Sequence, residues 1–478
     1  MKSPQRSSKQ NRNGFKIADC ILIIFTGLEV TYHTWLALTR HMWAKENSML
    51  QSPTFVKLLN VDFYLTVAFL AYVLLWFAVG RFMASDIRNR QKAVLKCFCA
   101  PDTILMLALF IWYLVTNLAY SDKTNQLVSY MRYELDAGIC AVILFPLGKI
   151  LGPRKMKRFL DVVFHLILAF STVAICIMLF NLLSGRKMVL YNTLSVYVKK
   201  KTGRVYFGTN ENIAAMIGLT MVYICLYLFF IHRHRVGRII YAVLMFPHVF
   251  ATLATGSRAC FLALLITLPA AAALFVWTHL DRPDARRRLL LFLAAFAVGI
   301  ICIWVLRSVV ALIFKSSSGN SFSQKSLFKD TGRLPIWNAS LHMMIDNAKQ
   351  FTFGIPKLRI PEYIEKHITQ LYGSGSSYAH AHNQILQVGC AQGVPAMFAY
   401  IAFLLILAIR SLKIVIMEIK KRSKRGFLVI PICLFGMMLV NMFEPFIWLY
   451  FSVMGCVFFL LSGLLYDAEK ELSSVDLK

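Results

Sequence analysis

The sequence of 478 residues is poor in charged side chains. Charged residues make up 16% of the chain, against about 25% in a typical soluble domain. Apolar residues reach 58%. Because surface area grows almost as fast as volume, a water-soluble core cannot bury this much apolar side chain. The composition excludes a soluble enzyme and indicates a chain embedded in lipid.

Acidic residues are especially scarce, with 23 Asp and Glu against 52 Lys and Arg and a net charge of +29. In a soluble protein, this excess would indicate nucleic acid as the partner. Here the basic residues lie mostly in short runs between apolar stretches, a pattern that sets orientation in a bilayer and meets anionic headgroups. We therefore interpret the basic residues as signals that set the membrane topology. We expect membrane lipids, not nucleic acid, as partners.

Several motifs are also lacking. The 11 cysteines form no zinc-type CxxC pair and no extracellular disulfide framework, since they lie in apolar stretches or, for Cys97 and Cys99, in a basic loop. No heptads, internal repeats or low-complexity tracts stand out. No small-residue cleavage site follows the first apolar run, which predicts that this run is retained as a span. A metal scaffold and a disulfide scaffold are not expected.

Long apolar stretches dominate what is there. A helix crossing about 30 Å of hydrocarbon at about 1.5 Å per residue needs roughly 20 apolar residues. Twelve stretches qualify, and the fourth is the weakest because Asp136 and Pro146 interrupt it. Their approximate limits are 16–37, 61–81, 102–120, 134–151, 159–184, 210–231, 237–255, 257–278, 289–313, 384–409, 427–445 and 447–466.

The basic residues orient these spans. With the N-terminus in the cytoplasm, most Lys and Arg fall in short cytoplasmic loops, as the positive-inside rule requires, and an even span number returns the C-terminus to the same side. We predict an all-α, multi-pass protein of the cytoplasmic membrane with both termini cytoplasmic. Its parts are a basic N-terminus (1–16), spans one to nine (16–313), an extracytoplasmic loop domain (314–383), spans ten to twelve (384–466) and a cytoplasmic tail (467–478).

The long loop between spans nine and ten contains helix-like pieces, LPIWNASLHMMIDNA and IPEYIEKHITQLY, separated by Gly and Pro turns. Loops of this length in a compact protein are usually functional or disordered. We expect a small, mainly helical cap over the outer face.

Polar groups at the rim of a membrane bundle are costly and are therefore candidates for function. Asn210, Glu211 and Asn212 lead into the sixth span, where they suit either a site or a helix N-cap with an acidic first turn. Arg258 heads the eighth span, where its planar guanidinium suits either phosphate binding or a headgroup anchor. We expect the groups described in the next three paragraphs to lie on the same, outer side of the membrane.

His248 lies on a polar stripe with Thr252 and Thr255 that points toward the turn before Arg258. A single histidine of this kind is more often a satisfied buried group, so we interpret His248 only as cavity lining. Arg333 precedes a proline that can start a helix. An arginine at a helix N-terminus combines two sources of positive potential and predicts an anion site.

His380, His382 and Asn383 lead directly into the tenth span. Histidine can accept or donate a proton near neutral pH, and the neighbouring amide could orient it or a substrate. An HAH pair also suggests a metal. However, alternate residues point in different directions, no Asp or Cys lies nearby, and no DxD motif occurs on the outer side. We therefore predict a site without metal.

Asn441 and Glu444 lie at positions i and i+3 at the outer end of span eleven. They could buffer the arginines or contact sugar hydroxyls, and a helix-ending Glu-Pro turn is the structural alternative.

Taken in order, these residues resemble the O-antigen ligase and polysaccharide polymerase superfamily of bacterial envelopes. The resemblance covers roughly residues 209–463, and the first five spans match only in general character. Its motifs are TGSRACFLALL, then GRLPIWNASLHMMIDN and FGIPKL in the outer loop, then HNQILQVGCAQGVPAMFAYIAFLL, and finally the late Asn and Glu-Pro pair.

The resemblance implies a C-type glycosyltransferase-like fold and a metal-independent, inverting glycosyltransferase without cofactors. Its donor would be a glycan on a polyprenyl diphosphate, and its acceptor a hydroxyl of a glycan or lipid on the outer face of the membrane. By the same resemblance, Arg258 and Arg333 would bind the donor diphosphate and His382 would be the base on the acceptor hydroxyl.

Two functions remain open within the resemblance. The enzyme could polymerise surface polysaccharide repeat units, which we favour, or ligate finished glycan onto its final acceptor. A lipid-linked oligosaccharide flippase is the alternative from another class. A transporter places charges deep in both halves of the bundle. Here the candidates gather at one rim, and Arg307 is the clearest intramembrane basic residue.

Overall fold

The structure is a computed structural model. It describes residues 99–120, 153–184, 211–232, 234–279, 285–315, 333–373, 380–421, 426–448 and 452–473 without a break, and shorter pieces of the remaining chain. The described chain is helical apart from a two-stranded antiparallel hairpin in which Val196 pairs with Phe207. The strands are β1 (Val196–Val198) and β2 (Val205–Phe207).

The helices fall into a membrane set and a cap set. The membrane set is α5 (Pro101–Ala119), α7 (Pro153–Leu183), α8 (Glu211–Ile231), α9 (Arg235–Ala254), α10 (Arg258–His279), α11 (Ala285–Lys315), α15 (Gln384–Gln392), α16 (Val394–Lys421), α17 (Val429–Asn441) and α18 (Val453–Ser473). The cap set is α12 (Arg333–Ile345), α13 (Ala348–Phe353), the 3₁₀ turn η3 (Lys357–Arg359) and α14 (Ile360–Tyr372). The described part of the loop is therefore mainly helical, as expected.

Seven described helices are long and apolar enough to cross a membrane. They are Pro101–Ala119, Phe159–Leu182, Glu211–Ile231, Arg235–Ala254, Arg258–Trp277, Leu289–Val310 and Val394–Lys420. They correspond to the predicted third and fifth to tenth spans. The predicted first, second and fourth spans lie mainly outside the described residues.

The last three predicted spans differ from the structure in detail. The stretch 384–409 is not one helix, because it breaks at Gly393 between α15 and α16. The eleventh span is the 13-residue apolar helix α17, shorter than the predicted 427–445. The twelfth begins at Val453 rather than 447 and continues past 466 into charged residues. These differences arise because turns rich in apolar residues do not interrupt a hydropathy pattern.

The break at Gly393 has a packing reason. Gly393 has φ +85°, and a Cβ there would collide with the backbone carbonyl of Thr352 in α13. Gly354, with φ +70°, faces the backbone of Gln392 and Gly393 in the same way. The amide of Ile355 then donates to the carbonyl of Cys390 at 2.7 Å. Two glycines thus let the cap backbone lie directly against the start of α16.

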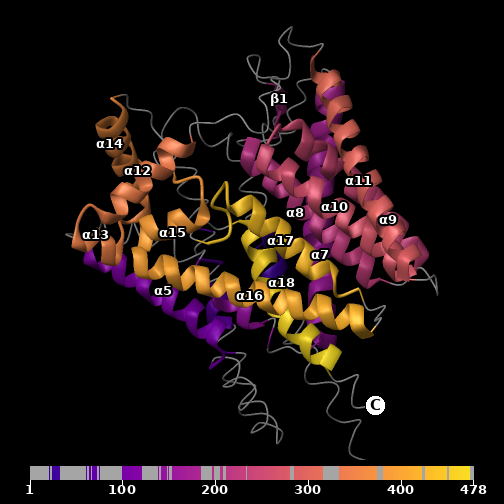
Figure 1. The fold of residues 1–478 in the computed structure, drawn as a ribbon, viewed down its shortest axis with the longest axis horizontal. Coiled ribbons are helices and arrows are strands. Elements are labelled where there is room, and N and C mark those ends of the chain that lie inside the picture. Colours follow the sequence, from indigo (N-terminus) through magenta and orange to yellow (C-terminus); the bar gives the residue numbers. More distant parts are fainter. Residues whose placement is uncertain are drawn as a thin grey trace, which may run out of the picture.

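The membrane helices form a bundle with α8 near its centre. α8 is apolar on all sides and 89% of its span is buried, as expected for a helix enclosed by others. It packs against α9, α17 and α18, while α10 packs against α11 and α17. In contrast, α11 is exposed along its span, as expected for a lipid-facing helix. Figure 1 shows α9, α10 and α11 side by side at one edge of the molecule.

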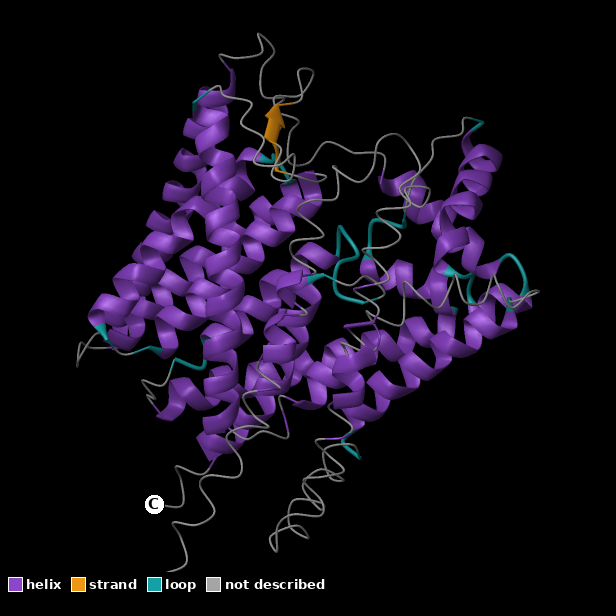
Figure 2. Cartoon of the chain, turned by 180° about the vertical axis from the view of Figure 1, so that it is seen from behind, coloured by secondary structure: helices purple, strands orange, loops and turns teal. Residues whose placement is uncertain are grey.

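The cap lies toward the opposite edge. In Figure 1, α12, α13 and α14 lie beyond the ends of α5 and α15, away from α9 and α11. The hairpin packs against α7 and α8 and projects from one end of the helical body (Figure 2). The indole of Trp112 in α5 donates to the carbonyl of Gln392 at 2.9 Å, and Gln392 donates to the carbonyl of Leu109 at 2.7 Å. These bonds connect α5 to the break between α15 and α16.

Candidate functional site

A cluster of polar side chains forms where the starts of α8 and α12 meet the chain before α15 and the turn after α17. We call Asn212, Arg333, His380, His382 and Glu444 the rim cluster. Its members come from four separate stretches of the sequence. The structure therefore brings together five of the ten candidates that the sequence identified.

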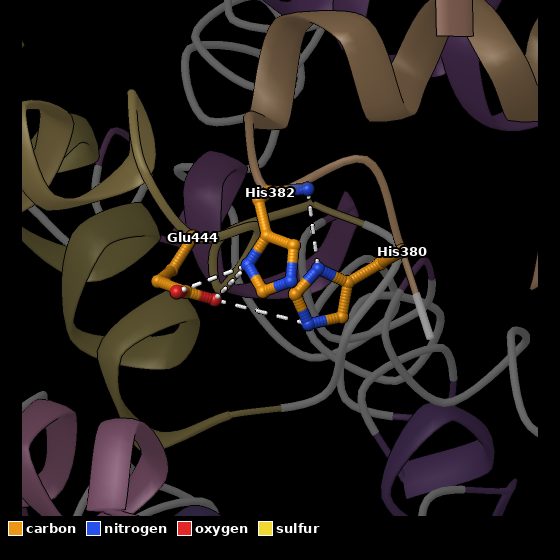
Figure 3. Close-up of side chains that lie close together, drawn as sticks. All are labelled: His380, His382 and Glu444. Carbon is orange, nitrogen blue, oxygen red and sulfur yellow. Dashed lines mark hydrogen bonds and ion pairs between the residues drawn. The ribbon is translucent and has the colours of Figure 1, made fainter. Parts of the chain in front are cut away.

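Glu444 is the centre of the rim cluster, with only 2% of its side chain exposed. Its Oε1 accepts from the Arg333 guanidinium at 2.8 Å and from the Asn212 amide at 3.0 Å. Both of its oxygens lie near Nδ1 of His382, at 3.1 and 3.2 Å. Its Oε2 lies 3.8 Å from Nε2 of His380 (Figure 3). A buried carboxylate is stable only with such partners.

These partners keep Glu444 ionised. Burial alone raises the pKa of Glu444, but the hydrogen bond from His382 and the electrostatic interactions with His382, His380 and Arg333 outweigh it. The net result is a pKa below the ordinary value for glutamate. The rim cluster therefore holds a negative charge at its centre at neutral pH.

The ionised carboxylate sets the tautomer of His382. A carboxylate only accepts hydrogen bonds, so Nδ1 of His382 must carry the proton that bridges to Glu444. In the neutral imidazole, Nε2 then has a free lone pair. This is the arrangement of an oriented general base, in which an acidic partner holds the ring and stabilises the imidazolium after proton transfer.

The backbone of His382 is in an unusual conformation. Its φ is +49°, the only positive value of a residue other than glycine among the described residues. Such a conformation costs about 1 to 3 kcal/mol and persists where the surroundings impose it. The surroundings here are the Trp337 indole, which donates to the His382 carbonyl at 3.4 Å, and Gln387, which accepts from the Ala381 amide at 2.9 Å.

His380 supports the turn from the inside. Its Nδ1 accepts from the backbone amide of His382 at 3.2 Å, and the two rings lie 4.2 Å apart between centroids. Burial lowers the pKa of His380 to about 4, and the charges of His382, Lys357 and Arg333 act in the same direction. His380 is therefore neutral at neutral pH. Because its Nδ1 accepts, its proton is on Nε2, which faces Glu444.

The expectation that the HAH pair diverges is wrong. The positive φ of His382 reverses the chain, so both rings face the same carboxylate. As a result, His380, His382 and Glu444 offer ligand atoms within 4.8 Å of one another, a group that could hold a metal ion. Two imidazoles and a carboxylate suit zinc. However, Glu444 already forms an ion pair with Arg333, which adds a positive charge beside any bound cation.

Asn383 and Asn441 hold the backbone around the rim cluster. The Asn383 side chain caps α15 by accepting from the amides of Ile385 and Leu386, and its amide donates to the carbonyl of Met442 at 3.2 Å. The Asn441 side chain accepts from the amides of Phe446 and Ile447 at 2.7 and 3.0 Å. Their side chains therefore shape the turn that carries Glu444.

Three other candidates are placed differently. His248 is fully buried and its Nε2 lies 3.0 Å from the Thr172 hydroxyl of α7, so it belongs to the packing between α7 and α9. Arg258 is half-buried at the first residue of α10. Arg258 is not one of the five residues of the rim cluster. Asn210 lies outside the described residues.

Sequence reasoning missed the link between His382 and Glu444. The two residues are 62 positions apart and no local spacing connects them. It also passed over Lys357, which lies within electrostatic reach of His380. The FGIPKL motif that contains Lys357 was the available signal for that residue.

One family model matches part of the chain. Residues 240–401 match the family model described as O-antigen ligase. The matched part contains Arg258, Arg333, His380 and His382, whereas Asn212 and Glu444 lie outside it. No curated protein sequence matches the chain.

Proposed function

We propose that this chain is a multi-span membrane protein of glycan transfer and that the rim cluster is its active site. The match of residues 240–401 to the O-antigen ligase family model and the seven candidate spans support this proposal. The proposed reaction transfers glycan from a polyprenyl-diphosphate-linked donor to an acceptor hydroxyl at the outer face of the cytoplasmic membrane. The observation that carries this proposal is the pairing of His382 with the buried Glu444 carboxylate beside Arg333.

His382 acts as the general base in this proposal. The acceptor oxygen attacks the anomeric carbon, and its proton passes to Nε2 of His382. The bond from the anomeric carbon to the diphosphate oxygen breaks on the opposite side, so configuration inverts. A positioned imidazole contributes about 10²- to 10⁴-fold to such a step.

Glu444 is a positioning residue. It holds the Nδ1 proton of His382 and stabilises the imidazolium that forms when Nε2 takes the acceptor proton. The Glu444 carboxylate is already in position before the reaction, so no groups have to move to stabilise the imidazolium of His382.

Arg333 and Arg258 bind the donor diphosphate in this proposal. One terminal nitrogen of Arg333 is bonded to Glu444, while the guanidinium carries further N–H donors that suit phosphate oxygens. Arg333 also lies at the first residue of α12, where the helix dipole favours an anion. The negative charge that develops on the lipid diphosphate is thereby offset without a divalent ion.

We favour polymerisation of repeat units, in which the acceptor is another repeat unit. Ligation of finished glycan onto its final acceptor is the alternative. The test supplies lipid-linked donor to purified protein and sizes the products. A ladder of chain lengths supports the polymerase. A single transfer to an added acceptor supports the ligase, and no transfer by wild-type protein contradicts the proposed function and favours a transporter.

A further inference from the structure

Arg307 is a basic residue within the apolar span Leu289–Val310 of α11. Its guanidinium carbon lies 4.2 Å from the ring centroid of Phe261 and 5.7 Å from that of Trp304. Among the described residues, no carboxylate forms an ion pair with it. A charged side chain inside the membrane is costly, and such groups usually mark a functional site.

The side chain of Arg307 does not extend toward the nearer end of α11. Trp304 is one turn closer to the start of the helix, and helical side chains lean toward the N-terminus of their own helix. The contact with Trp304 therefore keeps the guanidinium at the level of the apolar layer. The neighbouring residues Val305 and Val309 are exposed, so this part of α11 faces lipid.

Arg307 lies close to the head of α10. Phe261, which the guanidinium covers, is three residues after Arg258 on α10 and therefore on the same face of that helix. α10 and α11 pack along their lengths, side by side in Figure 1. Arg307 thus contacts α10 about one turn from Arg258.

We propose that Arg307 binds the diphosphate headgroup of the lipid-linked donor as it moves from the bilayer toward Arg258 and the rim cluster. This inference rests on the proposed function. Phe261 and Trp304 lie against the guanidinium by cation–π contact. The planar fork of N–H donors on this guanidinium suits two phosphate oxygens at once. The polyprenyl chain would lie along the exposed apolar face of α11.

Lipid phosphate could also come from an ordinary phospholipid, so the experiment compares two headgroups. Wild-type protein, Arg307→Gln and the control Arg287→Gln are placed in lipid nanodiscs that contain labelled polyprenyl diphosphate or labelled phosphatidylglycerol. Arg287 is the matched control because it is an exposed arginine at the other end of α11. Binding of each lipid is then measured.

We expect Arg307→Gln to bind polyprenyl diphosphate roughly tenfold more weakly, the size of one lost charge-assisted hydrogen bond. Phosphatidylglycerol binding should not change, and Arg287→Gln should match the wild type with both lipids. Unchanged diphosphate binding would overturn the inference. An equal loss for both lipids would also overturn it, because Arg307 would then be a general headgroup anchor.

Two further measurements keep the inference separate from the proposed function. Arg307→Lys retains the charge but loses the planar fork, so we expect an intermediate loss of diphosphate binding even if Arg307→Gln fails to fold. Glycan transfer is assayed in parallel. If the wild type transfers glycan and both Arg307 variants bind polyprenyl diphosphate as well as the wild type does, only the inference is refuted. If the wild type binds polyprenyl diphosphate but transfers no glycan, only the proposed function is refuted.

Discussion

His382 is the residue on which the proposed chemistry depends, because its Nε2 is free while its Nδ1 is bonded to Glu444. We predict that His382→Ala lowers the rate of glycan transfer by at least about 10²-fold, since the base is lost. The measurement is turnover of lipid-linked donor by purified protein, with membrane insertion checked alongside. Near-normal turnover in a correctly inserted variant would remove His382 from the mechanism.

The charge of Glu444 has a consequence for the rate of transfer. In Glu444→Gln the buried negative charge is lost, so the imidazolium that forms on His382 during the reaction is less stabilised. We predict a lower kcat with a smaller change in KM, because the lost interaction strengthens in the transition state. Steady-state kinetics of both proteins are the measurement. A kcat equal to that of the wild type would show that Glu444 does not act through His382.

His380 predicts a pH dependence of stability. Its pKa in the folded protein is about 4, below the ordinary 6.5, so the unfolded chain binds more protons between these values. The contribution of His380 to stability is therefore present above pH 6.5 and is lost as the pH falls toward 4. We predict that His380→Asn loses less thermal stability than wild type between pH 6.5 and 4. The measurement is the melting temperature of both proteins at several pH values. If it falls equally in both between pH 6.5 and 4, His380 is not the source of the pH dependence.

At the scale of elements, the junction between α15 and α16 shows what hydropathy misses. The stretch 384–409 is mostly apolar and carries no charge, so the sequence predicted one span. The structure ends α15 at Gln392 because the cap backbone at Gly354 occupies the space beside Gly393. The hydropathy pattern shows only that side chains are apolar, whereas the break depends on contact with the backbone of Gly354, 39 residues earlier in the chain.

This junction gives a stability prediction with a matched control. Gly393→Ala and Gly373→Ala both place a Cβ at positive φ, but only at Gly393 does it collide with backbone, while nothing lies within 4 Å at Gly373. We predict that Gly373→Ala costs about 1 to 2 kcal/mol from the left-handed conformation alone. Gly393→Ala should cost clearly more. Thermal unfolding in detergent measures both, and equal losses would contradict the packing of the cap against α16.

At the scale of the whole molecule, the sequence predicted a reaction without metal, yet the fold brings together three residues that could bind a metal ion. His380, His382 and Glu444 could hold an ion, but Glu444 already pairs with Arg333 and His382. We predict that EDTA leaves glycan transfer unchanged and that added zinc inhibits it, since zinc held by His380, His382 and Glu444 would replace the contact between Nδ1 of His382 and Glu444 that orients the base. Loss of turnover in EDTA that a divalent ion restores would overturn the metal-free mechanism.

The sequence by itself determined that the protein is a multi-span membrane protein and where seven of its candidate spans lie, and it identified the five polar residues that the structure brings together in the rim cluster. These properties depend on composition and order along the chain, because the cost of placing a polar or charged group in lipid is local to each segment. Only the tertiary structure decided that His380 and His382 face the same carboxylate and that Glu444 orients His382. Such pairings depend on a reversed backbone at His382 and on contacts between residues 62 positions apart, which no local pattern encodes.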